Sequence, residues 1–227
     1  MSAIKVDSIS ARAGTGTVSL PSGNNLSVAG TSTLTGNTSV GGNLAVTGNL
    51  TVSGTNNLVG SGQILEIVSS VCDGSTVNGY TFQNVSASQE FTTSYADVTG
   101  SSISYTPPAG TTQVVYEFNY HAGFQDNHAI ASLKFFIDSD EVVYGRHTYG
   151  ASTNFHARVT NKWIINIGGS ADTNVGRLAS WSGAKTLKLQ GRAYGSSNDS
   201  RIHSTMYWEA TGTGQFSMPT LTITAIK

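Results

Sequence analysis

The sequence has little charge, one cysteine and no long apolar run. Charged residues make up 11% of the 227 residues, whereas an ordinary globular protein has roughly 25%. The single cysteine, Cys72, excludes a framework of disulfides within the chain. No apolar segment approaches the length of about 18 residues expected of a transmembrane helix. The formal net charge is −1 without a basic cluster, so neither nucleic acid binding nor membrane insertion is predicted.

The sequence also lacks the short motifs of common enzymes. G-x-S-x-G, G-x-G-x-x-G, the Walker loop and C-x-x-C are all absent. The five histidines are not spaced as paired metal ligands, and the acidic run 138–141 lacks the glycine and distal glutamate of an EF-hand. Glu117 and Asp126 are candidates for a glycosidase pair, but nothing selects them. We therefore predict a protein that is not an enzyme, with no cofactor, no metal and no catalytic residue.

What the sequence does have is glycine in a fixed register. Six glycines recur every six residues: Gly30, Gly36, Gly42, Gly48, Gly54 and Gly60. An aliphatic residue lies two places before each glycine, and one more continues the series: Val28, Leu34, Val40, Val46, Val52, Leu58 and Ile64. A flexible linker requires composition but no register. The fixed period therefore indicates a repeat architecture.

The six-residue repeat predicts a triangular β-prism. Residues two apart, such as Leu44 and Val46, share one face of a strand, and the following glycine suits a corner. A single chain would form only two coils with open sheet edges, whereas three chains wound together remove most of those edges. We predict a homotrimeric shaft over residues 25–65, with the aliphatic series as its core and the glycines at its corners. A two-coil monomeric helix and a disordered tether are the alternatives.

Beyond the repeats, residues 66–227 have the composition of a globular β domain. The stretch "QVVYEFNYH" alternates, which predicts that Val114, Tyr116, Phe118 and Tyr120 face one side of a strand. The stretch "ASLKFFIDSDEVVYG" predicts a hairpin that turns at residues 138–140. Many short strands between turn signals favour a β-sandwich or jelly roll. The predicted fold class is thus all-β, a trimeric prism shaft followed by a sandwich head.

Aromatic residues near glycine- and serine-rich connections are candidates for ligand contact. An aromatic side chain in a loop offers a flat apolar face and, in tyrosine and tryptophan, a polar tip. Core or trimer-interface positions are the alternative for all of them. Trp163 and Trp208 lie in strand-like runs and are expected in the core. The candidate receptor contacts are Tyr149, Phe155, Trp181 and Tyr194.

Three stretches carry a resemblance to a protein family. They are "IKVDSISARAGTGTVSLPSG", "GNLAVTGNLTVSG" and "SSISYTPPAGTTQVVYEF", together with the ending "PTLTITAIK". The chain resembles short tail-fibre and structural fibre proteins of bacteriophages, especially cyanophages. The resemblance implies a homotrimer in the virion whose segment 1–24 attaches to a tail, baseplate or capsid protein. It also implies that the head at 66–227 faces outward and binds a glycan on the host cell.

The functional hypotheses differ in what the head contacts. The first is a non-enzymatic virion fibre, synthesised in the host cytoplasm, that adheres to the host surface. The second is a capsid decoration or baseplate protein that has no receptor role and whose head binds other virion proteins. The third is a small tailspike hydrolase. The first two hypotheses are distinguished by finding which end of the folded protein is exposed on virus particles. The third is tested by incubating the protein with host polysaccharide and measuring hydrolysis.

Overall fold

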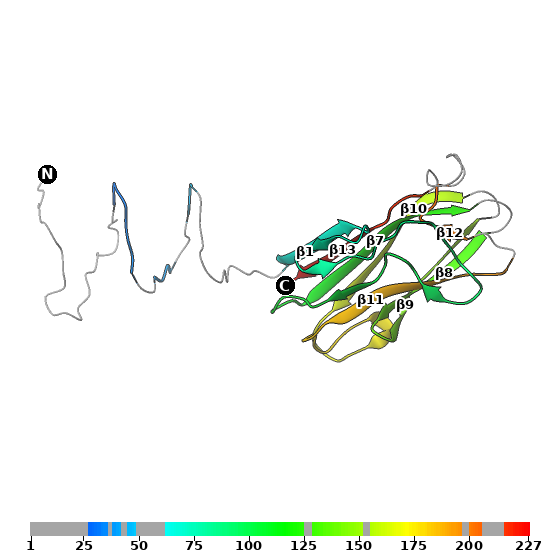
Figure 1. Cartoon of the computed structure of the whole chain (residues 1–227). Helices are drawn as coiled ribbons and strands as arrows, with labels where there is room; N and C mark the ends of the chain where they lie inside the picture. The colour runs from blue at the N-terminus through cyan, green and yellow to red at the C-terminus, as the bar shows by residue number, and fades with distance from the viewer. Residues whose placement is uncertain are drawn as a thin grey trace, which may run out of the picture. The chain divides into compact units, whose positions relative to one another are not determined.

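The structure is a computed structural model of the whole chain, which divides into two units, Met1–Thr55 and Asn56–Lys227 (Figure 1). Each unit is described by itself. The described residues are 27–35, 38–41, 45–48, 62–124, 129–151, 155–196, 200–205 and 216–227. No helix in these ranges is long and apolar enough to span a membrane. The predicted attachment segment 1–24 lies outside them.

In the first unit, the hexad aliphatics are exposed. Val28, Leu34, Val40 and Val46 have 46–70% of their surface accessible in the single chain. The backbone bends at residues 29–30, at residue 41 and at residues 47–48, which matches the hexad spacing. Gly30 and Gly48 lie in these bends but do not adopt positive φ, and no neighbour approaches either of them. The other predicted corner glycines, as well as Val52 and Leu58, lie outside the described residues.

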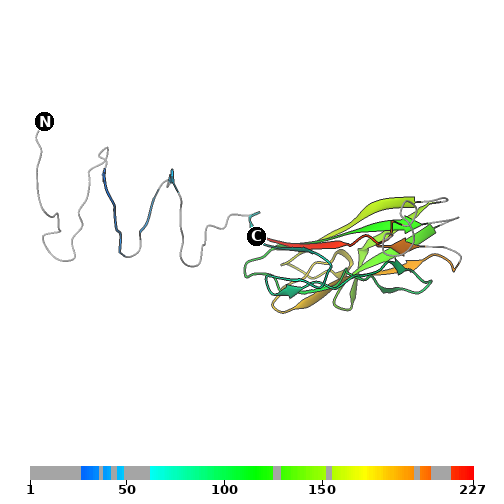
Figure 2. The ribbon, with the colours of Figure 1, turned by 45° about the horizontal axis from the view of Figure 1, so that its top comes forward.

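The second unit contains a six-stranded and a five-stranded antiparallel sheet that face each other (Figure 2). The strands of the six-stranded sheet are β1 (Ile64–Val71), β4 (Gln89–Glu90), β7 (Gln113–Phe124), β10 (Phe155–Asn166), β12 (Arg201–Ile202) and β13 (Thr220–Ile226). The strands of the five-stranded sheet are β5 (Ala96–Asp97), β6 (Ile103–Tyr105), β8 (Ala129–Ile137), β9 (Asp140–Ala151) and β11 (Lys185–Ala193). A small hairpin of β2 (Thr76–Val77) and β3 (Tyr80–Thr81) and one 3₁₀ turn (Thr173–Val175) complete the described elements.

The core lies between the two sheets, and strand alternation defines its members. Val114, Tyr116, Phe118 and Tyr120 of β7 are all buried, as the sequence predicted. β11 and β13 alternate in the same way, so that every second side chain points into the core. This period of two is the consequence of the pleat, which directs successive side chains to opposite faces. The all-β sandwich predicted for the head is therefore present.

The hairpin predicted around residues 138–140 is also present. Ile137 pairs with Asp140, and Asp138 occupies the turn with φ of 56°. The left-handed region is tolerated by aspartate better than by most side chains. The Asp138 carboxylate accepts hydrogen bonds from the Lys185 ammonium and the Thr186 backbone N–H, each at 2.8 Å. The acidic run 138–141 is thus a turn at residues 138–139 followed by the start of β9, and the Asp138 carboxylate already has hydrogen-bond partners.

Two predictions about single residues have different outcomes. Trp163 packs against the core, and its indole N–H donates to the Val175 carbonyl at 3.2 Å. Trp208 lies outside the described residues. Ile64, predicted to continue the shaft core, is the first residue of β1 and pairs with Ile226 within the head.

Candidate functional site

The four candidate receptor contacts occupy very different environments. Tyr194 follows β11 and is 71% exposed. Trp181 is buried, stands edge-on to Tyr105 with ring centroids 6.1 Å apart, and donates its indole N–H to the Gly183 carbonyl. Tyr149 packs against the core, where burial raises the pKa of its hydroxyl well above the usual value. The side chain of Phe155 lies outside the described part of β10.

Burial corrects the prediction for two of these residues. The stretches around Trp181 and Tyr149 are rich in glycine, serine and threonine, and such composition is typical of surface connections. Both aromatic rings nevertheless fold inward, because each contributes a large apolar area to the core. Trp181 is therefore a core residue, and Tyr149 is partly buried against the core. Among the candidates whose side chains are described, Tyr194 is the exposed one.

A groove of about 440 Å³ is lined in part by the two residues that follow Tyr194 in the chain, although Tyr194 is not itself among the lining residues. Its lining residues are Glu90, Phe91, Thr92, Thr93, Gly195 and Ser196. The two parts of this lining come from segments about a hundred residues apart in the chain. The Ala193 backbone N–H donates to the Thr92 carbonyl at 2.7 Å, which holds the first segment against the end of β11. We call the six lining residues the hydroxyl groove.

The hydroxyl groove combines hydroxyl groups with apolar surface. Thr92, Thr93 and Ser196 supply hydroxyl groups, of which that of Thr92 already exchanges hydrogen bonds with the Ser94 backbone. Phe91 is almost fully buried. Glu90 supplies a carboxylate that forms an ion pair with Arg201 at 3.3 Å. Hydroxyls and a carboxylate can each exchange hydrogen bonds with a polyol. The groove can thus offer hydrogen bonds to a hydroxyl-rich ligand, together with apolar surface.

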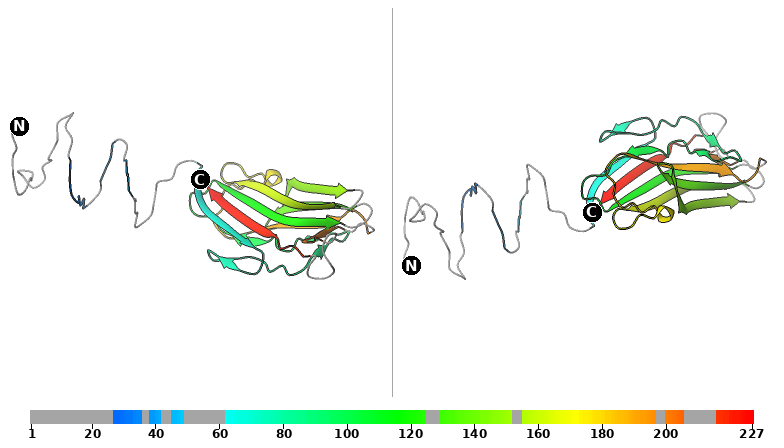
Figure 3. Two further views of the ribbon diagram at one scale, coloured as in Figure 1. Left: turned by 90° about the horizontal axis from the view of Figure 1, so that it is seen from above. Right: turned by 90° about the horizontal axis from the view of Figure 1, so that it is seen from below.

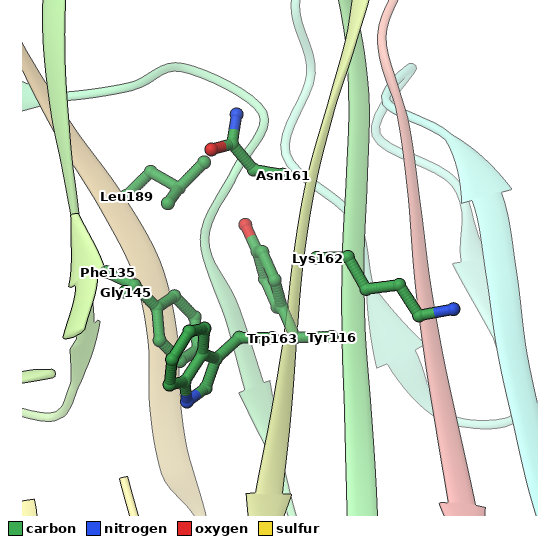
Figure 4. Close-up of a pocket in the computed structure, with 7 residues that line it drawn as sticks. All are labelled: Tyr116, Phe135, Gly145, Asn161, Lys162, Trp163 and Leu189. Atoms are coloured by element: carbon green, nitrogen blue, oxygen red, sulfur yellow. The ribbon is translucent and has the colours of Figure 1, made fainter. Parts of the chain in front are cut away.

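A second cavity lies inside the sandwich and is too small for a ligand. Its volume is about 20 Å³, close to the minimum that one water molecule requires, roughly 10–15 Å³. The Tyr116 hydroxyl donates to the Ser101 carbonyl, and the Asn161 amide donates to the Tyr120 hydroxyl. Figure 4 shows Tyr116 and Trp163 side by side, with Lys162 directed away from them. This cavity is a packing gap of the core.

Several surface carboxylates of the described residues are engaged in ion pairs, namely those of Glu90, Asp97, Glu117, Asp138 and Glu141. Glu117, one of the glycosidase candidates, lies 3.5 Å from the Lys162 ammonium. Asp126, the other candidate, lies outside the described residues. Among the residues that the structure describes, no group of three or more histidine, cysteine, aspartate or glutamate side chains could hold a metal ion. The described residues therefore contain no such ligand cluster, and the pairing of Glu117 with Asp126 stays a prediction.

One histidine is buried in a way that the sequence did not predict. His203 is fully buried, at φ of 59°, and its ring stands edge-on to Phe118 and Tyr120. Its Nε2 lies 2.9 Å from the Thr99 carbonyl oxygen. Burial lowers the pKa of His203 from 6.5 to about 4, so the ring is neutral near pH 7. No spacing in the sequence distinguishes this histidine from the exposed ones.

Comparisons with known proteins identify no family for the chain. No family model matches it, and no curated protein matches it. Among solved structures, a chain from "Structure of infectious bursal disease virus Gt strain" is similar to it with a TM-score of 0.34 and 9% sequence identity. The similarity covers 78% of this chain and 42% of that chain, so this chain spans less than half the length of the viral one. A TM-score of this size carries no argument about family or function.

Proposed function

We propose that the protein is a non-enzymatic fibre of a virion, homotrimeric through its hexads, whose head adheres to a glycan on the host cell. The observation that carries the proposal is a contrast within the chain. The head buries its own core, whereas the aliphatic side chains of the described hexads are exposed. Val28, Leu34, Val40 and Val46 recur in register and have 46–70% of their surface accessible. Burying such side chains is favourable by roughly 25 cal/mol per Å², so association with further copies of the hexads is the expected outcome.

The hydroxyl groove supports the adhesive part of the proposal. Sugars present hydroxyl groups for hydrogen bonds and apolar ring faces for contact with aromatic side chains. The hydroxyl groove supplies the first kind of partner, and Tyr194, next to Gly195 in the chain, supplies the second. An open groove of this kind binds weakly by itself. Three copies on one fibre raise the overall affinity through effective concentration.

The adhesive function is tested with an exposed tyrosine and a matched control. The full chain is applied to an array of bacterial surface polysaccharides, together with Tyr194→Ala and Tyr144→Ala. Tyr144 is 68% exposed on β9, in the same five-stranded sheet as β11, and it does not line the hydroxyl groove. Its exposure matches the 71% exposure of Tyr194. We expect Tyr194→Ala to lower the apparent affinity by about tenfold or more, while Tyr144→Ala binds as the wild type does.

Three results contradict parts of the proposal. Equal binding by both variants would remove Tyr194 and the hydroxyl groove from the contact. A trimeric protein that binds no polysaccharide of the array would favour the capsid decoration or baseplate role. New reducing ends after incubation with a polysaccharide would show hydrolysis and contradict a non-enzymatic fibre.

A further inference from the structure

The outer face of the six-stranded sheet carries an apolar row across four strands. Strand register aligns Ile67 of β1, Thr224 of β13, Val115 of β7 and Ile164 of β10. Figure 3 shows these four strands side by side, with β1 in cyan and β13 in red. Ile67 and Ile164, at the two ends of the row, are 51% and 46% exposed. The row therefore consists of three aliphatic residues and one threonine, with the two isoleucines at its ends about half exposed and the two central residues partly exposed.

Most of the exposed aliphatic residues of this face lie at one end, although Val71 of β1, which is 42% exposed, lies at the other end. At the apolar end the outermost row continues from Ile226 into the polar pair Gln113 and Asn166. Ile64, which is 53% exposed, pairs with Ile226 at the same end. The next row toward the other end is polar, with an ion pair between Glu117 and Lys162. We call the apolar end the basal patch, which consists of Ile64, Ile67, Val115, Ile164 and Ile226. It lies where the chain enters the head from the hexads.

The outer face of the five-stranded sheet has the opposite chemistry. Glu141 bridges Lys134 and Arg146, at 2.8 and 2.5 Å. Lys188 pairs with Asp97 at 2.9 Å on the same face. Removing such charges from water costs free energy that a new contact must first offset, whereas covering exposed aliphatic surface is favourable. Of the two outer faces, the basal patch is the one suited to burial.

Continuity with the hexads identifies the occupant as a second copy of the chain. Ile64 continues the six-residue series of Val40 and Val46, so the aliphatic stripe of the hexads runs in sequence directly into the basal patch. Copies joined through their hexads would hold their basal patches at a high effective concentration. The basal patch contains no charge, so identical copies meet there without repulsion between like charges.

We propose that the heads of neighbouring copies pack against each other through the basal patch. This inference rests on the proposed association of the hexads. It assigns the contact between heads to one end of one sheet, and it leaves the hydroxyl groove and the charged outer face of the five-stranded sheet free of the subunit contact.

Cysteine cross-linking in the full chain tests this inference. The native cysteine should not react with the cross-linker, because Cys72 is buried and burial raises the pKa of its thiol to about 12. Val115→Cys places a thiol in the basal patch, and Thr186→Cys places one on the outer face of the five-stranded sheet. Both original residues are β-branched and partly exposed in mid-sheet strands. With a short bismaleimide, we expect a covalent dimer from Val115→Cys and none from Thr186→Cys.

Introducing charge into the basal patch provides a second test of the contact between heads. Ile67→Lys with Ile164→Lys, added to Val115→Cys, should lower the dimer yield by about tenfold, because the lysines would be buried without partners. Tyr144→Lys should leave the yield unchanged. The lysines replace exposed side chains, so the head itself should keep its melting temperature.

The outcomes separate this inference from the proposed function. A trimeric wild type whose Val115→Cys variant gives no more dimer than Thr186→Cys would overturn the basal patch and leave the hexad trimer standing. The same trimer with undiminished cross-linking in the double lysine variant would also overturn it. A wild type that is monomeric would overturn both the hexad trimer and the contact between heads.

Discussion

The hexads and the head contain the same kinds of aliphatic side chain, but these are exposed in the described hexads and buried in the core of the head. Val40 of the hexads is about half exposed, whereas Val114 of the head is fully buried. Val40 belongs to the six-residue series with Leu34 and Val46, and Val114 begins the alternating inward series of β7. The difference is in the number of layers, because the head folds one sheet over another and the described hexads have no second layer within the chain. A β pattern therefore completes its core only where the chain supplies the opposing layer.

The largest effect is expected when charge is placed in the hexads. Val40→Asp with Val46→Asp brings six carboxylates into the thin core of a trimeric prism, where unpaired charge is costly. We expect loss of the trimer, with a head that still unfolds at its normal temperature. Light scattering and calorimetry measure the two properties separately. A double variant that stays trimeric with the wild-type melting profile would refute the prism.

A substitution in the head core should have the converse effect. Phe118 is fully buried and stacks on Tyr120 with ring centroids 5.4 Å apart. Phe118→Ala leaves a cavity and should lower the free energy of unfolding of the head by about 3–5 kcal/mol. Urea titration measures this loss, and Phe118→Leu serves as the milder control. The hexad association should persist, so an equal loss of oligomer mass would show that the two regions are not independent.

A smaller effect, again limited to the head, is expected from pH. The unfolded chain protonates His203 near pH 6.5, whereas the folded head resists protonation until a pKa of about 4. The unfolded state therefore binds more protons between these values, and the stability of the head falls as the pH is lowered from 6.5 to 4. The loss attributable to His203 is on the order of 3 kcal/mol.

The control for this pH dependence is His203→Asn, which removes the titrating ring and tolerates positive φ. Its urea midpoint should vary less between pH 6.5 and 4 than that of the wild type. An unchanged pH dependence would assign the acid sensitivity to other groups.

The sequence predicted the parts of the head that depend on local pattern. The inward face of β7 follows from the period of two, and the turn at Asp138 follows from its polar residues between two β-rich runs. Both features involve residues close together in the chain, where spacing alone decides the outcome.

The candidate site was harder to predict, because it depends on contacts between distant segments. Trp181 has loop-like neighbours, yet it packs on Tyr105, 76 residues earlier in the chain. The hydroxyl groove joins residues 90–93 with residues 195–196, which no repeat or motif connects. The burial of His203 likewise depends on β7 and on Thr99. Only the assembled sandwich brings these residues together.

The solution mass of the purified full chain tests the central claim most directly. One chain has a mass of 23.7 kDa. The account predicts a mass near 71.1 kDa by light scattering, three times 23.7 kDa, because the exposed hexad aliphatics require partner copies. A mass near 23.7 kDa at all concentrations would contradict the fibre and would make the hexads a short monomeric coil or a tether.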